Sequence, residues 1–105
     1  MVNSLEEKKA EDIILLDLKE ISILADYFLI CSGTSERNLR TLSHTVAETA
    51  KDQFGILCKI EGQPSGGWLA LDLGDIIVHI FSPDQRNFYQ LEQLWQNSKL
   101  ILRLK

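Results

Sequence analysis

One stretch of the chain, from Trp68 to Phe81, restricts the possible folds more than any other. Its sequence is WLALDLGDIIVHIF, two short apolar runs separated by the turn sequence DLGD. Apolar runs of this length around a turn that contains Gly and Asp predict a β-hairpin. The hairpin also carries Trp68, Asp72, Asp75 and His79 among Leu, Ile and Val. These polar groups indicate either an unusual core or a recognition surface.

The length of the turn determines which side chains of the hairpin share a face, because a slip of one residue exchanges the faces. A two-residue turn would require positive φ at Leu73, which is costly for a branched side chain, and would place Trp68 opposite His79. A three-residue loop requires positive φ only at Gly74, and it is the register that we expect. It pairs Trp68 and Ala70 with Val78 and Ile76, and its opposite face carries Leu69, Leu71, Ile77, His79 and Phe81.

Each polar residue of the hairpin has a structural interpretation beside the functional one. Trp68 is as readily a core residue as a contact, and His79 is more often a hydrogen-bonded core histidine than a catalytic or metal-binding one. Asp72 and Asp75 are typical turn formers, because aspartate side chains bond their own backbone. In either register we expect Leu73 to lie exposed at the tip, as an apolar docking contact between two carboxylates.

The remaining segments predict a single α/β domain over residues 1–105, a mixed β-sheet flanked by α-helices. Continuous apolar runs at 13–18 and 27–31 indicate strands covered on both faces. Thr34 or Ser35 is expected to cap a helix that ends at Gly55. A short strand at 57–61, a loop at 62–67 and a last helix from Ser82-Pro83-Asp84 follow. The tail from Lys99 is expected to add a strand or to pack against a partner. The apolar stripe of the first long helix is Leu39, Leu42, Val46, Ala50 and Phe54, and the last helix presents Phe88, Leu91 and Trp95.

Composition restricts the function classes. The chain has 15 acidic and 11 basic residues among 105, a net charge of −4. This charge gives no electrostatic attraction to nucleic acid and suits a basic protein partner better. Cys31 and Cys58 lack metal-binding spacing and are interpreted as reduced thiols. The first residues lack an apolar signal core, and no apolar run is long enough to span a bilayer. We therefore expect a cytoplasmic protein.

The sequence contains little that indicates catalysis. Ser32-Gly33-Thr34-Ser35 follows a strand and precedes a helix, a context that can cradle a phosphate. It lacks the glycines and the lysine of a P-loop, and the next strand supplies one acid, Glu61, where a nucleotidyltransferase needs paired carboxylates for Mg²⁺. We expect no catalytic residues, metal or cofactor, and a binding module rather than an enzyme. A nucleotide-binding enzyme that uses 32–35 is the weaker alternative.

Long segments of the chain resemble one family, the ribosomal silencing factors, also called the Iojap family. The resemblance rests on DIILLDL from Asp12, DYFLICSGTSERN from Asp26, EG at 61–62, WLALDLGDIIVHIF from Trp68 and RNFYQLEQLW from Arg86. It covers nearly the whole chain. It implies a nucleotidyltransferase-like fold without the catalytic site.

The resemblance also implies a function. The family is expected to bind large-subunit ribosomal protein fourteen and to block the joining of the small subunit sterically. Organellar relatives point to large-subunit assembly as the alternative. The docking residues implied for this chain are Trp68, Asp72, Leu73, Asp75 and His79, with Trp68 as the apolar anchor and the two aspartates facing basic groups. The family resemblance also favours a homodimer in isolation.

Overall fold

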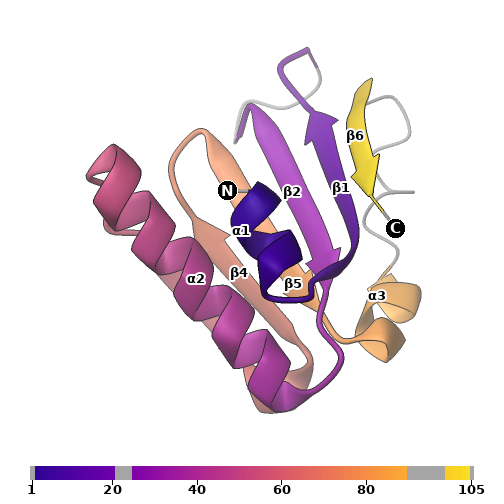
Figure 1. Ribbon diagram of the computed structural model, residues 1–105. Helices are drawn as coiled ribbons and strands as arrows, with labels where there is room; N and C mark the ends of the chain where they lie inside the picture. Colours follow the sequence, from indigo (N-terminus) through magenta and orange to yellow (C-terminus); the bar gives the residue numbers. More distant parts are fainter. Residues whose placement is uncertain (1, 21–24, 90–98, 105) are drawn as a thin grey trace.

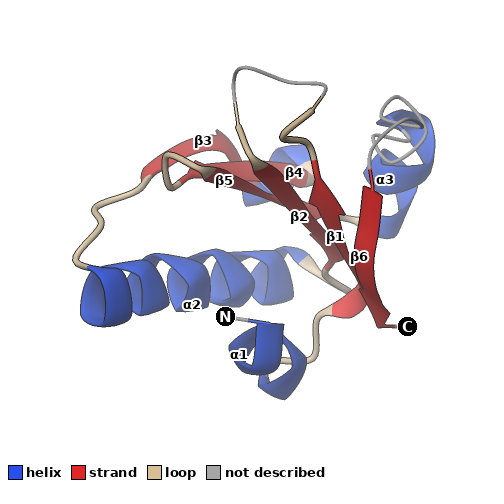
Figure 2. Cartoon of the chain, turned by 90° about the horizontal axis from the view of Figure 1, so that it is seen from above, coloured by secondary structure: helices blue, strands red, loops and turns tan. Residues whose placement is uncertain are grey.

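The protein forms a six-stranded mixed sheet with helices on both sides (Figures 1 and 2). The computed structural model describes residues 2–20, 25–89 and 99–104. The α-helices are α1 (Val2–Glu7), α2 (Glu36–Phe54) and α3 (Pro83–Tyr89), and a 3-10 turn, η1, spans Pro64–Gly66. The strands are β1 (Glu11–Asp17), β2 (Tyr27–Ser32), β3 (Lys59–Gln63), β4 (Trp68–Asp72), β5 (Ile76–Phe81) and β6 (Lys99–Leu104).

The order of strands in the sheet is β3-β4-β5-β2-β1-β6. Strands β2 and β5 run parallel, and the other neighbouring pairs are antiparallel. Helices α1 and α2 cover one face, and α3 lies on the other side of the sheet (Figure 2). The predicted mixed sheet flanked by helices is therefore confirmed, and the tail from Lys99 adds the edge strand β6.

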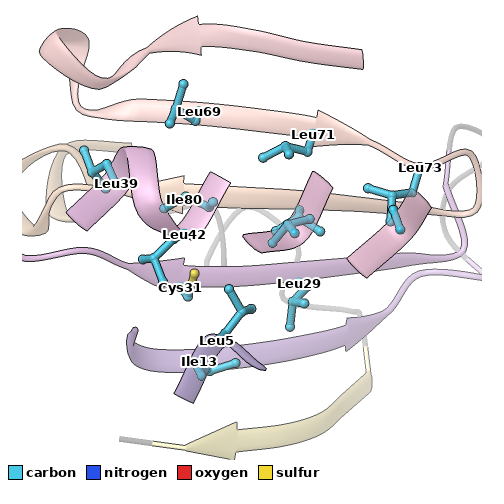
Figure 3. Close-up of a cluster of buried hydrophobic side chains, with 13 residues drawn as sticks. Leu5, Ile13, Leu29, Cys31, Leu39, Leu42, Leu69, Leu71, Leu73 and Ile80 are labelled. Atoms are coloured by element: carbon cyan, nitrogen blue, oxygen red, sulfur yellow. The ribbon is translucent and has the colours of Figure 1, made fainter. Parts of the chain in front are cut away.

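The apolar strands bury side chains on both faces, as their continuous runs predicted. The cluster under α1 and α2 contains Leu5, Ile13, Leu29, Cys31, Leu39, Leu42, Val46, Ala50, Leu69, Leu71, Leu73, Val78 and Ile80 (Figure 3). The opposite face holds Ile14, Leu16, Leu18, Ile30 and Phe81, with Phe28 and Trp68 packed against them. Since consecutive residues of a strand alternate between faces, Ile13 and Ile14 belong to different clusters.

Helix α2 begins and ends where the sequence indicates. The Ser35 hydroxyl accepts the N–H of Asn38 at 3.0 Å, so Ser35 is the N-cap. Gly55 ends the helix with φ of 66°. The predicted stripe is buried from Leu39 to Ala50, but Phe54 is 60% exposed. The burial predicted for Phe54 is therefore wrong, because its side chain borders an open groove instead of closed core.

The register predicted for the hairpin is also wrong. Trp68 pairs with Phe81, and Ala70 pairs with His79. The Leu73 N–H donates to the Ile76 carbonyl at 2.9 Å, so Gly74 and Asp75 form the turn. Gly74 has φ of 96° and takes the first central position, where a type II′ turn accepts glycine. Both registers considered from the sequence centred the turn too early. In the observed register Leu73 continues the strand, and its φ is not positive.

Leu73 is consequently not an exposed docking tip. Its side chain is 9% exposed and belongs to the cluster beneath α2 (Figure 3). Because the turn begins only at Gly74, Leu73 continues the strand and points to the same face as Leu69 and Leu71, where α2 covers it. The prediction that Leu73 offers an exposed apolar contact is therefore wrong.

Two further expectations concern the ends of the elements. The strand expected at 57–61 begins at Lys59 and ends at Gln63, so the predicted loop starts later, and Leu57 is 83% exposed before it. The expected helix after Ser82 is present as α3, while the face of Phe88, Leu91 and Trp95 lies outside the side chains that the structure describes. None of the helices in the described ranges is long and apolar enough to cross a membrane.

Candidate protein-binding site

The pairing of β4 with β5 brings Trp68 and His79 together on the sheet face that lies opposite α1 and α2. The Trp68 indole Nε1–H donates to Nδ1 of His79 at 3.2 Å. Trp68 is half-buried, and His79 is 7% exposed. The three-residue register put these residues on opposite faces, and the structure corrects this. The two-residue register placed both on one face but made them direct partners, whereas His79 pairs with Ala70.

The hydrogen bond from Trp68 determines the state of the His79 ring. A neutral imidazole that accepts at Nδ1 carries its proton on Nε2. This Nε2 is buried and has no hydrogen-bond partner among the described residues. Burial lowers the pKa of His79 from 6.5 to about 4. At neutral pH the ring is therefore uncharged and holds the indole through an acceptor.

Two phenylalanines complete an aromatic cluster around this pair. Phe28 of β2 meets His79 edge-on, with ring centroids 4.7 Å apart. Phe81 stacks on Trp68 with centroids 5.1 Å apart and an interplanar angle of 26°. These contacts hold the indole in a defined orientation on the sheet. Sequence reasoning missed Phe28, which lies in an ordinary apolar run. It placed Phe81 on the face of His79, but away from Trp68, because only the observed strand pairing brings the two rings together.

A shallow hollow of about 200 Å³ lies beside the indole, lined by Glu61, Gly62, Trp68 and Ala70. Glu61 pairs with Ala70 across β3 and β4 and is exposed. Gly62 has φ of 90°, and a Cβ on it would lie 2.3 Å from the Trp68 carbonyl oxygen. Only glycine lets β3 approach this closely, so the hollow depends on that residue. The EG pair in the sequence was the available signal for both residues.

The two aspartates of the turn lie at the far end of the hairpin from Trp68. Asp72 is four residues from Trp68, which is about 13 Å along a strand. Its Oδ1 accepts the Gly74 N–H at 2.8 Å, so it forms the turn as its structural interpretation predicted. The Asp75 carbonyl accepts the N–H of Asp26 at 2.8 Å and ties the turn to the start of β2. Both residues are exposed.

The five residues predicted to form one docking site therefore divide among three places. Trp68 and His79 form the aromatic cluster on one face, and Asp72 and Asp75 form the acidic end of the hairpin. Leu73 is packed under α2 on the opposite face. Glu61, rather than either aspartate, lines the hollow beside the indole.

The segment 32–35, considered as a phosphate cradle, uses its polar groups internally. The Ser32 hydroxyl accepts from Nη1 of Arg86 at 3.0 Å. The Thr34 N–H donates to the Asn38 side chain at 3.0 Å, and Ser35 caps α2. These bonds favour a structural role for the segment. Within the described ranges, no group of three or more His, Cys, Asp or Glu side chains is placed to hold a metal ion.

Arg86 is a buried charge that sequence reasoning missed. It is 5% exposed, and its Nη1 also donates to the Asp12 carbonyl at 2.6 Å. Its Nη2 lies 3.6 Å from the Asp12 carboxylate, which Arg103 of β6 also contacts at 3.3 Å. The network joins β1, β2, α3 and β6 at one end of the sheet. It anchors α3 to this end of the sheet.

Comparisons with known proteins agree along the whole chain. The family model described as "Ribosomal silencing factor during starvation" matches residues 1–105. A Bacillus subtilis protein named ribosomal silencing factor RsfS is 43% identical over 96 residues, which cover 90% of this chain and 80% of that protein. A mouse protein named mitochondrial assembly of ribosomal large subunit protein 1 is 34% identical over 98 residues, 90% of this chain and 43% of its own.

A solved structure has the same fold. A crystal structure of a Bacillus halodurans protein superposes with a TM-score of 0.81 at 39% identity, covering 96% of this chain and 91% of that one. The agreement extends the match from sequence to the arrangement of the sheet and helices. The curated names describe silencing and assembly factors rather than enzymes, and this supports the expectation of a non-enzymatic protein.

Proposed function

Because this chain belongs to the ribosomal silencing factor family, we propose that it is a translational repressor that docks on the large ribosomal subunit. The contact is made with large-subunit ribosomal protein fourteen. The bound domain occupies space that the small subunit needs for joining, so the block is steric and requires no chemistry. The protein acts in the cytoplasm, where both subunits are present.

The observation that supports the docking site is the half-buried indole of Trp68 on the sheet face opposite α1 and α2. Its ring is oriented by the His79 acceptor and by stacking on Phe81, so little conformational entropy is lost when a partner covers it. Oriented aromatic side chains are common energetic centres of protein interfaces. The hollow beside the ring offers a partner side chain a place to insert.

Charge supports a basic partner at this face. The exposed Glu61 lines the hollow, and the exposed Asp72 lies at the end of the same strand pair. The whole chain carries a net charge of −4. Carboxylates at the edge of an apolar contact accelerate encounter with a positively charged surface and orient the two proteins. Glu61→Lys is therefore expected to lower the rate constant of association with the large subunit and to make that rate constant less dependent on salt concentration.

The first test is a sucrose gradient of purified protein with separated ribosomal subunits, with wild type, Trp68→Ala and Leu57→Ala. Wild type should migrate with the large subunit and reduce the fraction of joined ribosomes. Removal of an anchoring indole costs about 2 kcal/mol or more, which corresponds to about 30-fold weaker binding. Leu57 is an exposed apolar residue outside the site, so its variant controls for loss of general surface hydrophobicity.

Two outcomes would count against this proposal. If folded Trp68→Ala bound the large subunit as tightly as wild type, the aromatic cluster would not be the docking site. If wild type remained at the top of every gradient, the repressor function itself would be wrong. Trp68→Phe should retain part of the affinity, because it keeps an aromatic ring beside Phe81 while losing the N–H and part of the ring area.

Large-subunit assembly is the second candidate function, and the name of the mouse relative favours it. The two functions differ in the particle that is bound, and they use the same contact. Sedimentation with immature and mature large subunits separates them. Preference for immature particles, with unchanged subunit joining, would assign the protein to assembly instead of repression.

A homodimer in isolation is a further part of this proposal. Strand β6 lies at the edge of the sheet and pairs with β1 alone among the described strands. Leu100 and Ile101 on it are 58% and 51% exposed. An exposed apolar edge strand pairs readily with a second copy about a two-fold axis. Analytical ultracentrifugation should show a dimer that Ile101→Lys dissociates, and a monomer at every concentration would refute this part.

A further inference from the structure

The hairpin turn has a second surface, on the face that α1 and α2 cover. There, Leu73 and Asp75 line a groove of about 280 Å³ together with Phe54, Ile56 and Ile76. Val2 of α1 and Leu15 of β1 also contribute to its walls. The groove lies on the opposite face of the sheet from Trp68, because Leu73 belongs to the helix-side cluster and Trp68 to the other.

This groove is apolar and open. Asp75 is the one charged group among the described residues that line it. Phe54 stands at its rim with 60% of its surface exposed, although it continues the stripe that α2 buries elsewhere. Ile56 and Ile76 remain partly exposed. Contiguous exposed apolar surfaces of this kind commonly mark interaction sites in soluble proteins.

The size and charge of the groove narrow the choice of occupant. Its volume of about 280 Å³ lies at the lower edge of the range of about 300–1,000 Å³ typical of small-molecule pockets, and it accommodates a few side chains of a larger partner. The exposed Asp75 carboxylate would repel a fatty acid or an anionic lipid headgroup. It would attract a Lys or Arg next to an apolar side chain.

We propose that this groove binds an amphipathic basic helix of a second protein partner. The helix lays apolar side chains at helical spacing against Phe54, Ile56 and Ile76, and one of its basic side chains pairs with Asp75. In helix-in-groove binding of this kind, the side chains that enter the groove stand at positions i, i+3 or i+4, and i+7 of the bound helix. The site is independent of the proposed ribosomal contact, because it uses the other face of the sheet.

The test uses a labelled synthetic peptide of about 18 residues, with Leu on one helical face and Lys on the other, long enough to form a helix when bound. A matched peptide has Glu in place of every Lys. Fluorescence anisotropy should show saturable binding of the Lys peptide and at least about ten-fold weaker binding of the Glu peptide. Asp75→Asn should reduce this preference.

Variants locate the binding. Phe54→Ser should weaken the Lys peptide about ten-fold, and Leu57→Ser, which removes an exposed apolar side chain outside the groove, should not. Phe54→Ser should leave co-sedimentation with the large subunit unchanged, and Trp68→Ala should leave peptide binding unchanged. The two proposals can therefore fail separately.

Three results would overturn the inference. The first is the absence of saturable binding of the Lys peptide to the wild-type protein. The second is equal binding of both peptides, or binding that Phe54→Ser does not weaken. The third is a wild-type dimer that dissociates with Phe54→Ser in analytical ultracentrifugation, since that would assign the groove to a second copy of this chain.

Discussion

Protonation of His79 should couple the aromatic cluster to the stability of the whole domain. The ring is buried, accepts the Trp68 N–H at Nδ1, and has a pKa lowered from 6.5 to about 4. In the unfolded chain, the same histidine takes up a proton near its ordinary pKa. Between these two pKa values the unfolded state binds more protons than the folded state. Stability is therefore expected to fall as the pH decreases through this window.

The magnitude follows from the difference between the two pKa values. A fall from 6.5 to about 4 is about 2.5 pH units, and each unit corresponds to about 1.36 kcal/mol. The full effect is therefore about 3 kcal/mol, reached near pH 4. By about pH 5, which is still above the ordinary carboxylate range, the expected loss is about 2 kcal/mol. That is a large fraction of the stability of a small domain.

Urea denaturation followed by circular dichroism at about pH 7.5 and about pH 5 measures this loss. The informative variant is His79→Gln, which keeps an acceptor for the indole and does not titrate. It should lose about 2 kcal/mol less than wild type over this range. His44→Gln is the matched control, because His44 lies exposed on α2 beside Glu48. It should retain the wild-type pH dependence.

Equal losses in wild type and His79→Gln would refute this reasoning, because burial would then not keep the ring neutral. If the loss of stability at low pH disappeared in His44→Gln and remained in His79→Gln, the effect would belong to His44, and the reasoning would also be refuted. Near pH 4 and below, protonation should also break the bond to Trp68, since a protonated Nδ1 is a donor.

Three other expectations can be checked on single variants. Gly62→Ala should lower the free energy of unfolding, measured by thermal denaturation, by about 2 kcal/mol or more, because its Cβ would meet the backbone of β4. Gly66→Ala is the control: its Cβ would meet nothing within 4 Å, so the stability should hardly change. Ser35→Ala should cost about 1 kcal/mol by the same measurement, through loss of the α2 N-cap. Burial raises the pKa of Cys31 to about 12, so a thiol reagent should label the half-buried Cys58 first and Cys31 only on unfolding, and equal labelling of both in the folded protein would contradict this.

Local chemistry was sufficient to predict most of the elements. The run IILLDL has too many consecutive apolar residues for a half-exposed strand, and β1 is indeed buried on both faces. Gly55 ends α2 as predicted, and of the two predicted N-caps, Thr34 and Ser35, it is Ser35 that caps the helix, because capping depends on residues within one turn of the helix end. The exposure of Phe54 was not predictable in this way, since it depends on which side chains from distant segments border the end of the helix.

The candidate site was only partly accessible to sequence reasoning. Trp68 and His79 were selected by residue type, but their hydrogen bond exists because β4 and β5 pair in one particular register. Leu73 was assigned to the wrong surface for the same reason. Glu61 lines the hollow beside the indole from the neighbouring strand β3, and Arg86 bonds to Asp12 across 74 positions of the chain.

The sequence by itself determined the composition of the elements, their order and the family to which the chain is similar. Apolar periodicity, caps and turn residues act over a few positions, and the family motifs are long enough to be recognised directly. The tertiary structure alone decided which residues meet. A shift of one residue in a single turn moves every side chain of a strand to the opposite face. In this protein the pairing lies three positions from the expected register, an odd number that exchanges the faces, so Trp68 and His79 share one surface and Leu73 lies on the other.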